Sequence, residues 1–142
     1  MTIAEKEAEI VSEFEFLTDW LDKYELIIDK GNQNPGIDPQ YKTDQYLIEG
    51  CQSKVWVQAE YRDGKVYYQG ESNTEIVGGM VSMLIDVLSG ETPDDILAAE
   101  LGFIDQIGLK EHLSPTRSNG LVAMVKQMRL YAMVFKEKSN EL

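Results

Sequence analysis

The fold of this 142-residue chain is decided by residues 55–68, which read VWVQAEYRDGKVYY. Residues 55–61 alternate between two faces, which is the two-residue period of a half-buried strand. The Asp63-Gly64 pair that follows is typical of a two-residue hairpin turn. With this turn Tyr61 faces Val66 on the returning strand, so the apolar faces of the two strands coincide. The sequence therefore predicts an antiparallel hairpin.

One further strand is expected before the hairpin. Tyr46, Leu47 and Ile48 form a short apolar run, and residues 50–53 then provide a polar reversal. We therefore expect a small antiparallel sheet of about three strands. The preceding residues 31–43 contain two Gly, two Pro and two Asn, a composition that predicts a loop.

Helices are predicted on both sides of the hairpin. Two are expected within the first thirty residues, where apolar side chains recur at intervals of three, four and seven, and Gly31 is expected to end the second. Residues 76–88 are apolar on nearly every side and predict a central helix. Ser72 is the expected cap of that helix.

The rest of the chain predicts three more helices. A short one begins at Pro93, a second short one covers residues 103–107, and a long one begins near Pro115. The order of elements contains no strand–helix–strand alternation. It therefore predicts a single domain over residues 1–142, of the α+β class, with the helices packed on one face of the sheet.

The composition excludes several classes of function. The chain has 25 acidic and 13 basic residues and a net charge of −12, which argues against nucleic-acid binding because phosphate contacts need a basic surface. The single Cys cannot form an internal disulfide or a Cys-rich metal site, and it indicates a reducing compartment. The acidic start does not resemble a targeting peptide, and the longest apolar stretch is too short to cross a bilayer. We expect a cytoplasmic protein that binds neither nucleic acid nor membranes.

Cys51 and His112 are the candidate reactive residues. The sequence has no glycine-rich phosphate loop, dinucleotide fingerprint, nucleophile elbow or pair of His at metal-ligand spacing. Cys51 lies in the polar turn of residues 50–53, where backbone amides and the charge of Lys54 are expected to favour the nucleophilic thiolate. A lone Cys is also commonly a small buried apolar side chain, so both interpretations stay open.

His112 also has two interpretations. It can be the base of a Cys–His dyad with Cys51, which would make the protein a hydrolase or acyltransferase. It can instead hydrogen-bond the start of the last helix in a structural role. A third class of function, a non-catalytic binding module that uses the acidic first helices, is also open.

Three blocks of the chain resemble the SufE-type sulfur acceptor family, which includes the CsdE-like paralogues. Residues 50–56 read GCQSKVW and are similar to the family's cysteine motif G-C-Q-S-x-V-W. Residues 70–80 read GESNTEIVGGM and form the second block. Residues 112–121 read HLSPTRSNGL and are similar to the family segment H-L-[ST]-x-[ST]-R-x-x-G-L. With residues 24–31, these blocks extend the resemblance over nearly the full chain.

The chain departs from the family pattern at a few positions. The second block commonly reads S-D-A and then K-G-L, whereas this chain has Asn73 in place of the acidic residue and Gly78 in place of the Lys. Residues 33–36 replace the Leu-Pro that usually follows the second helix. These changes are expected to affect the affinity for a partner or the position of the Cys loop. The cysteine block and the Arg block are intact.

The resemblance implies an accessory sulfur-transfer protein rather than an enzyme, with a SufE/IscU-like fold. A PLP-dependent cysteine desulfurase, SufS-like or CsdA-like, would pass persulfide sulfur to Cys51 and be stimulated by this protein. The sulfur would then go to an iron–sulfur scaffold such as a SufBCD-type complex. PLP belongs to the desulfurase, so we expect this chain to need no cofactor and no metal.

The resemblance also implies roles for individual residues. Cys51 would carry the persulfide and would be sheltered in an apolar cavity between encounters. Gly50, Gln52, Ser53 and Arg117 would support the loop and the persulfide, with His112 as an auxiliary residue. Arg117 can equally be an ordinary surface residue at the start of a helix. The sequence leaves open which desulfurase and scaffold are used, whether the SufE or the CsdE-like route is served, and whether the chain forms a homodimer.

Overall fold

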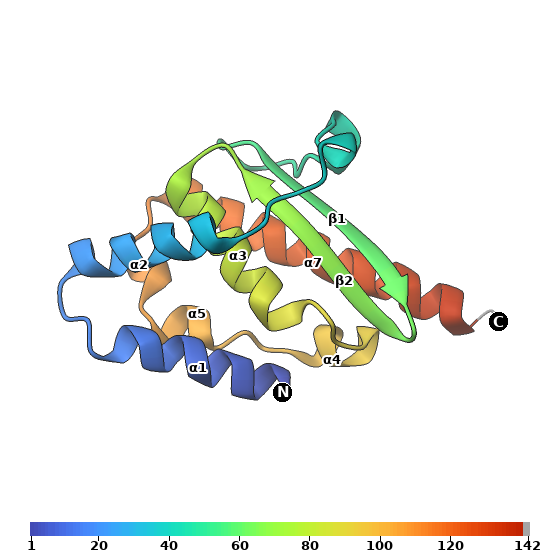
Figure 1. The fold of residues 1–142 in the computed structure, drawn as a ribbon, viewed down its shortest axis with the longest axis horizontal. Coiled ribbons are helices and arrows are strands. Elements are labelled where there is room, and N and C mark those ends of the chain that lie inside the picture. Colours follow the sequence, from blue (N-terminus) through green and yellow to red (C-terminus); the bar gives the residue numbers. More distant parts are fainter. Residues whose placement is uncertain (141–142) are drawn as a thin grey trace.

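The computed structural model describes the backbone of residues 1–140 and their side chains, except those at positions 110, 112 and 140. A hairpin of two strands lies across a layer of helices (Figure 1). The elements in chain order are α1 (Ile3–Glu15), α2 (Trp20–Gln33), the 3-10 turns η1 (Pro39–Tyr41) and η2 (Asp44–Tyr46), β1 (Val55–Arg62), β2 (Lys65–Ser72), α3 (Glu75–Leu88), α4 (Pro93–Ala98), α5 (Phe103–Gln106), α6 (Leu109–His112) and α7 (Pro115–Asn140).

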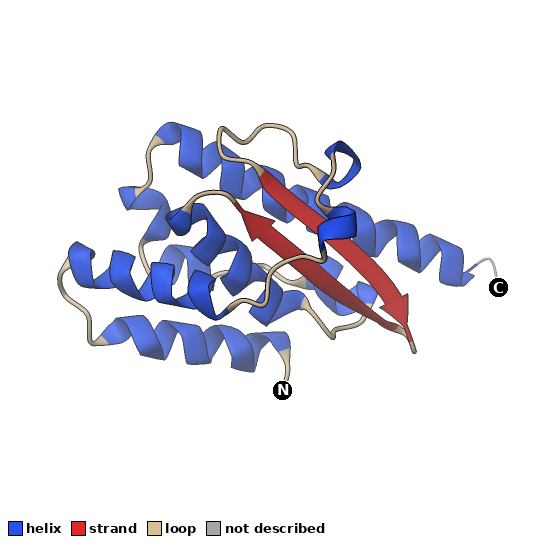
Figure 2. Ribbon diagram, turned by 45° about the horizontal axis from the view of Figure 1, so that its top comes forward, coloured by secondary structure: helices blue, strands red, loops and turns tan. Residues whose placement is uncertain are grey.

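The predicted hairpin is confirmed together with its register. Tyr61 pairs with Val66 and Ala59 pairs with Tyr68 in an antiparallel ladder. Asp63 and Gly64 have φ angles of 51° and 80°, so both turn residues adopt the left-handed conformation that suits the twist of the strands. The α+β class is also confirmed, with the helices on one face of the hairpin and the η1–η2 segment on the other (Figure 2).

The expected third strand is reduced to a single bridge. Leu47 pairs with Trp56 in one isolated antiparallel bridge, and Ile48 N donates to Val55 O at 2.8 Å. Residues 44–46 turn as η2 instead of extending. Because the chain then departs from β1 toward α7, no second pair of residues is aligned, and the described sheet has two strands.

Two expected helix boundaries are wrong. Helix α2 continues past Gly31 to Gln33, so the expected loop of residues 31–43 begins later and contains η1. Ser72 ends β2 and does not cap α3, whose N-cap is Thr74. The Ser72 hydroxyl instead accepts a hydrogen bond from Thr74 N at 3.3 Å, within the turn that precedes the helix.

Helix α3 forms the centre of the core because glycine lets α2 approach it closely. A Cβ atom at Gly79 would overlap the carbonyl oxygen of Ile27, and one at Gly31 would lie 2.9 Å from Gly79 N. Helix α3 also packs against β2, where Val81 and the glycine at position 70 are in contact. This close packing fixes the start of α3, which forms one wall of the site described below.

Helix α7 is fixed to the hairpin by two tyrosine hydroxyl groups. The Tyr68 hydroxyl donates to Met128 O at 2.7 Å, and the Tyr131 hydroxyl donates to Val57 O at 2.9 Å. Tyr61 stacks on Phe135 farther along the helix, with ring centroids 5.5 Å apart. These contacts hold α7 against the hairpin, and the first turns of α7 form one wall of the site described below. Among the described residues, no helix is both long and apolar enough to span a membrane.

Candidate functional site

Cys51 lies on the loop that joins the Leu47 bridge to β1. Gly50, immediately before it, has a φ angle of +91°, a backbone conformation that residues with a side chain rarely adopt. A Cβ atom on Gly50 would also lie 3.6 Å from the Cβ atom of Ala123 on α7. Gly50 therefore allows the chain to turn sharply against α7 and to direct the following Cys toward the helices.

The end of the Cys loop is tied to the turn between β2 and α3. Lys54 N donates to the Asn73 side-chain oxygen at 2.9 Å, and Asn73 N donates to Lys54 O at 3.1 Å. The Thr74 hydroxyl donates to the Ser53 hydroxyl at 2.8 Å. The amide oxygen of Asn73 accepts the hydrogen bond that a carboxylate at this position could also accept, so this departure from the family pattern preserves a link to the loop.

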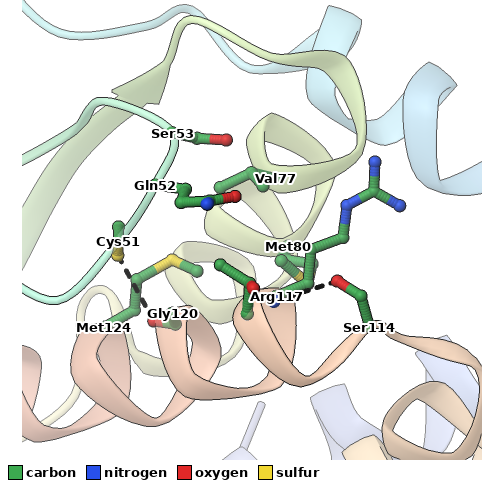
Figure 3. A pocket seen from close by; sticks show the side chains of 10 residues that line it. Cys51, Gln52, Ser53, Val77, Met80, Ser114, Arg117, Gly120 and Met124 are labelled. Carbon is green, nitrogen blue, oxygen red and sulfur yellow. Dashed lines mark hydrogen bonds between the residues drawn. The ribbon is translucent and has the colours of Figure 1, made fainter.

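Cys51 opens into a pocket of about 400 Å³ between three segments of the chain (Figure 3). The Cys loop, the start of α3 and the first turns of α7 each form one wall. The lining residues are Cys51, Gln52, Ser53, Val77, Met80, Ser114, Thr116, Arg117, Gly120 and Met124. The structure thus brings together residues from all three sequence blocks, although Cys51 and Gly120 are 69 positions apart in the chain.

The Cys51 thiol is half-buried and faces the backbone of α7. Its Sγ atom lies 3.6 Å from the carbonyl oxygen of Gly120, to which the thiol donates a weak hydrogen bond. Burial raises the pKa of the Cys51 thiol, because the pocket disfavours the charged thiolate. The expectation that the loop and Lys54 favour the thiolate is therefore wrong for this conformation: Lys54 is exposed and does not line the pocket.

Arg117 is the one charged residue among the described residues that line the pocket. Its backbone N donates to the Ser114 hydroxyl at 3.3 Å, which anchors the start of α7. Its side chain is exposed, and Figure 3 shows the guanidinium extending away from the thiol. Within the described part of the chain it has no ion pair or side-chain hydrogen bond. Arg117 therefore lies at the pocket mouth, where it is available to an anion brought in from outside.

The other candidate residues divide into two groups. Gln52 is exposed and Ser53 is partly buried, and both line the pocket beside Cys51. The side chain of His112 lies outside the described residues, so the Cys–His dyad stays a hypothesis. The described lining residues include no carboxylate or imidazole that could act as a base toward Cys51.

Three residues that shape the site were not assigned a role from the sequence. Met80 and Met124 provide the apolar walls, but both also follow the apolar spacing of ordinary core helices. Gly120 lies inside α7, where glycine is unfavourable, and this is a signal that could have indicated a close contact. Within the described residues, no three or more His, Cys, Asp or Glu side chains are grouped so as to hold a metal ion.

Comparisons with known proteins show which family this chain resembles. Residues 8–132 match the family described as SufE, Fe-S metabolism associated domain. A SufE-like protein of Synechocystis is 36% identical over 129 residues, which cover 91% of this chain and 81% of that protein. A SufE-like protein of Rhizobium meliloti is 32% identical over 126 residues, which cover 85% of this chain and 90% of that one.

Two further comparisons concern a longer protein and a solved structure. The chain is 34% identical to a chloroplastic/mitochondrial SufE-like protein of Arabidopsis thaliana, over 94% of this chain but only 36% of the plant protein. A solution structure of a hypothetical protein from Thermus thermophilus has the same fold, with a TM-score of 0.74 and 23% identity over 90% of this chain and 93% of that one. On the strength of the family match and the two bacterial relatives, the chain belongs to the SufE family, which is associated with iron–sulfur metabolism.

Proposed function

We propose that this protein accepts sulfur from a PLP-dependent cysteine desulfurase onto Cys51 and passes it on for iron–sulfur cluster assembly. The observation that carries the proposal is the position of the only Cys of the chain, on a loop that turns at Gly50 and lies at the side of a pocket. Membership of the SufE family supports the same role. The desulfurase supplies PLP, and this chain supplies the acceptor thiol.

The transfer is a thiol exchange at sulfur. The Cys51 thiolate attacks the terminal sulfur of a persulfide on the desulfurase and forms a new S–S bond. The S–S bond of the desulfurase persulfide breaks, and its electron pair remains on the desulfurase thiolate. Cys51 then carries the persulfide, and no net oxidation or reduction takes place.

Burial requires the loop to open before this exchange. The Cys51 thiol is half-buried against α7, and its raised pKa lowers the fraction of reactive thiolate. A desulfurase that draws the loop outward would expose the sulfur and bring its pKa closer to the ordinary value. Arg117, at the pocket mouth, would then stabilise the anionic sulfur during entry or return.

The Cys51→Ser variant tests the proposal. The alanine that a SufS-like or CsdA-like desulfurase releases from cysteine is measured with and without the wild-type protein and the variant. We expect the wild type to stimulate the desulfurase and the variant to give no stimulation, with an unchanged urea midpoint because Ser is close to Cys in size. Full stimulation by the variant would contradict the proposal.

A His112→Ala variant separates the carrier from a Cys–His hydrolase. A hydrolase requires both residues, because the imidazole must activate the thiol. A carrier requires mainly the thiol, so we expect His112→Ala to retain most of the stimulation.

A further inference from the structure

A second groove runs along α7 and shares no lining residue with the pocket of Cys51. It has a volume of about 410 Å³ and lies between α7 and residues 100–105, which lead from α4 into α5. This space is here called the α7 groove. Most of its lining is apolar and consists of Leu101, Ile104, Leu121, Val122, Val125 and Met133.

The apolar lining continues onto the solvent-exposed side of α7. Val122 and Met133 of the groove are 59% and 46% exposed, and Leu130 and Val134 are 42% and 44% exposed. Positions 122, 126, 130 and 134 are four residues apart, so they form one row along the helix. Single exposed apolar side chains are common on protein surfaces, but a row of them beside an apolar groove is typical of a surface that binds another molecule.

The two walls of the α7 groove are fixed in place. The Arg129 guanidinium donates through Nη2 to Ala99 O at 2.6 Å, which ties α7 to the chain just before the facing wall. Leu101 in that wall is buried and has a φ angle of 58°, a conformation that bulky residues rarely adopt, so its burial holds the backbone there. Phe103 N donates to Glu7 Oε1 at 3.4 Å. The groove is therefore already formed before anything binds to it.

The two walls carry opposite charges. Lys126 and Arg129 line the α7 side, whereas Glu100 and Asp105 line the facing wall. Lys126 is exposed and has no ion pair with any described residue. Helix α7 has five basic residues and one acidic residue, although the whole chain has a net charge of −12. An occupant of matching charge therefore has acidic groups toward α7 and basic groups toward residues 100–105.

The shape of the groove fits a helix. Its lining on α7 extends from Leu121 to Met133, a distance of about 18 Å or roughly three helical turns. The backbone groups inside α7 are bonded within their own helix, so this wall offers no edge to which a strand could be added. An amphipathic helix can instead place apolar side chains in such a groove at intervals of three, four and seven residues.

A second copy of this chain fits the groove less well. Its acidic helix α1 already buries its apolar side chains in its own core. Packing α7 against the α7 of another copy would bring two basic helices together, which is unfavourable. The charges therefore favour a different protein as the occupant.

We propose that the α7 groove docks an amphipathic helix of a partner protein, with an acidic edge toward α7 and a basic edge toward residues 100–105. The inference goes beyond the proposed function and does not rest on it. A partner in this groove uses none of the residues that line the pocket of Cys51.

The test uses a designed helical peptide of about 18 residues, which is long enough to cover the groove. The probe peptide has Leu along one face, Glu along one edge of that face and Lys along the other, and carries a fluorescent label for anisotropy. The control peptide has Lys along both edges. We expect the full-length protein to bind the probe roughly tenfold more tightly than the control. Added NaCl should reduce this difference, because salt screens exposed charges.

Two pairs of variants assign the binding to the groove. Val122→Gln combined with Met133→Gln should weaken binding of the probe roughly tenfold and leave the urea midpoint unchanged, because both side chains are exposed. Leu21→Gln, at a 70% exposed position on α2, should bind as the wild type does. Lys126→Glu should weaken binding of the probe, whereas Lys138→Glu changes an exposed residue of α7 outside the groove and should not.

Three results would overturn the inference. The first is equal affinity of the wild type for the probe and control peptides, and the second is wild-type affinity for the probe in the Val122 and Met133 double variant. The third comes from sedimentation: a wild-type dimer that the double variant converts to a monomer would make a second copy the occupant. If the double variant does not fold, Lys126→Glu decides in its place. None of these measurements involves sulfur transfer, so their failure differs from a failure of the proposed function.

Discussion

In the proposed function, Cys51 must satisfy two opposing requirements. A sulfur acceptor needs a thiolate that can reach another protein, whereas a stored thiol or persulfide needs protection from solvent. The structure shows the protected arrangement, with the thiol half-buried against Gly120 and its pKa raised by burial. We therefore expect reactivity in this protein to depend on movement of the loop rather than on a permanently activated side chain.

The raised pKa of Cys51 predicts an alkaline shift in its alkylation. Only the thiolate reacts, so the rate in the native protein should reach half of its maximum at a higher pH than in the urea-unfolded chain, where an ordinary Cys has a pKa of about 8.5. Rates measured with iodoacetamide over about four pH units, from roughly pH 7 to pH 11, check this. A native midpoint at or below the unfolded one would show that the thiolate is favoured in the folded protein.

The raised pKa of Cys51 also makes the free energy of unfolding fall as the pH becomes alkaline. Because the folded state keeps the proton of Cys51 to a higher pH, the stability it contributes is complete below the unfolded pKa and is lost as pH rises through the folded pKa. The free energy of unfolding of the wild type, relative to Cys51→Ser, should therefore fall over that alkaline range.

Arg117→Ala should reduce sulfur transfer more than stability. The side chain is exposed at the pocket mouth, so its removal should change the free energy of unfolding by no more than about 0.5 kcal/mol. Sulfur uptake from a desulfurase should become slower, because the pocket loses the one charged residue among its described lining residues. Lys54→Ala removes an exposed charge outside the pocket and is the control. A loss of several kcal/mol in urea would show instead that Arg117 is structural.

At the scale of elements, the site lies where the Cys loop, α3 and α7 meet, and these three segments are held by different contacts. Helix α7 is held by the hydroxyl groups of Tyr68 and Tyr131, and α3 is held by its close contact with α2 at Gly79. The Cys loop is tied at its end to the turn before α3, through Asn73 and Thr74, and its start turns at Gly50, which has a positive φ angle. We therefore expect the loop to be the segment that opens while the two helices stay in place.

Removal of the Asn73 contact should loosen the loop without unfolding the protein. Asn73→Ala loses the side-chain acceptor of Lys54 N, a hydrogen bond that contributes on the order of 1 kcal/mol. We expect Cys51 to be alkylated faster in this variant, while Asn73→Asp keeps an acceptor and stays near the wild-type rate. Equal alkylation rates in Asn73→Ala and the wild type would mean that the hydrogen bond between Lys54 N and Asn73 does not control exposure of the thiol.

The sequence predicts the individual helices and strands better than it predicts the contacts between them. The Asp63-Gly64 turn fixes the hairpin register, and Thr92-Pro93 marks the start of α4, because both signals are local. The prediction of a third strand is wrong because an apolar run at 46–48 cannot show whether a partner strand is aligned with it. The predicted direction of the Cys51 pKa shift is wrong because the shift comes from burial against α7, where the hydrogen-bond acceptor Gly120 lies 69 residues away in the chain.

At the scale of the whole molecule, charge and packing separate the two ends of the chain. Helix α1 is strongly acidic, with five Glu and one Lys, whereas α7 is basic, and the Lys136 of α7 pairs with Asp94 of α4. Figure 1 shows α1 and α2 on the side of α3 away from most of α7. Apolar contacts around α3 hold these parts together, so global unfolding requires the loss of this core, whereas loop opening does not.

Because loop opening leaves this core intact, we expect Cys51 to become reactive at urea concentrations well below those that unfold the protein. Local opening of a loop with few buried contacts costs less free energy than global unfolding. Alkylation should therefore accelerate at urea concentrations below the global transition, which circular dichroism follows on the same samples. Coincidence of the two transitions would mean that the thiol is exposed only when the core is lost.

The central claim, that Cys51 accepts sulfur, is tested most directly by counting sulfur atoms on it. The protein is mixed with a PLP-dependent cysteine desulfurase and isotopically labelled cysteine, and intact mass spectrometry is followed by peptide mapping. The account predicts one labelled sulfur atom on the peptide that contains Cys51, its removal by a thiol reductant, and no labelling of Cys51→Ser. Stimulation of the desulfurase without any labelled sulfur on Cys51 would contradict it.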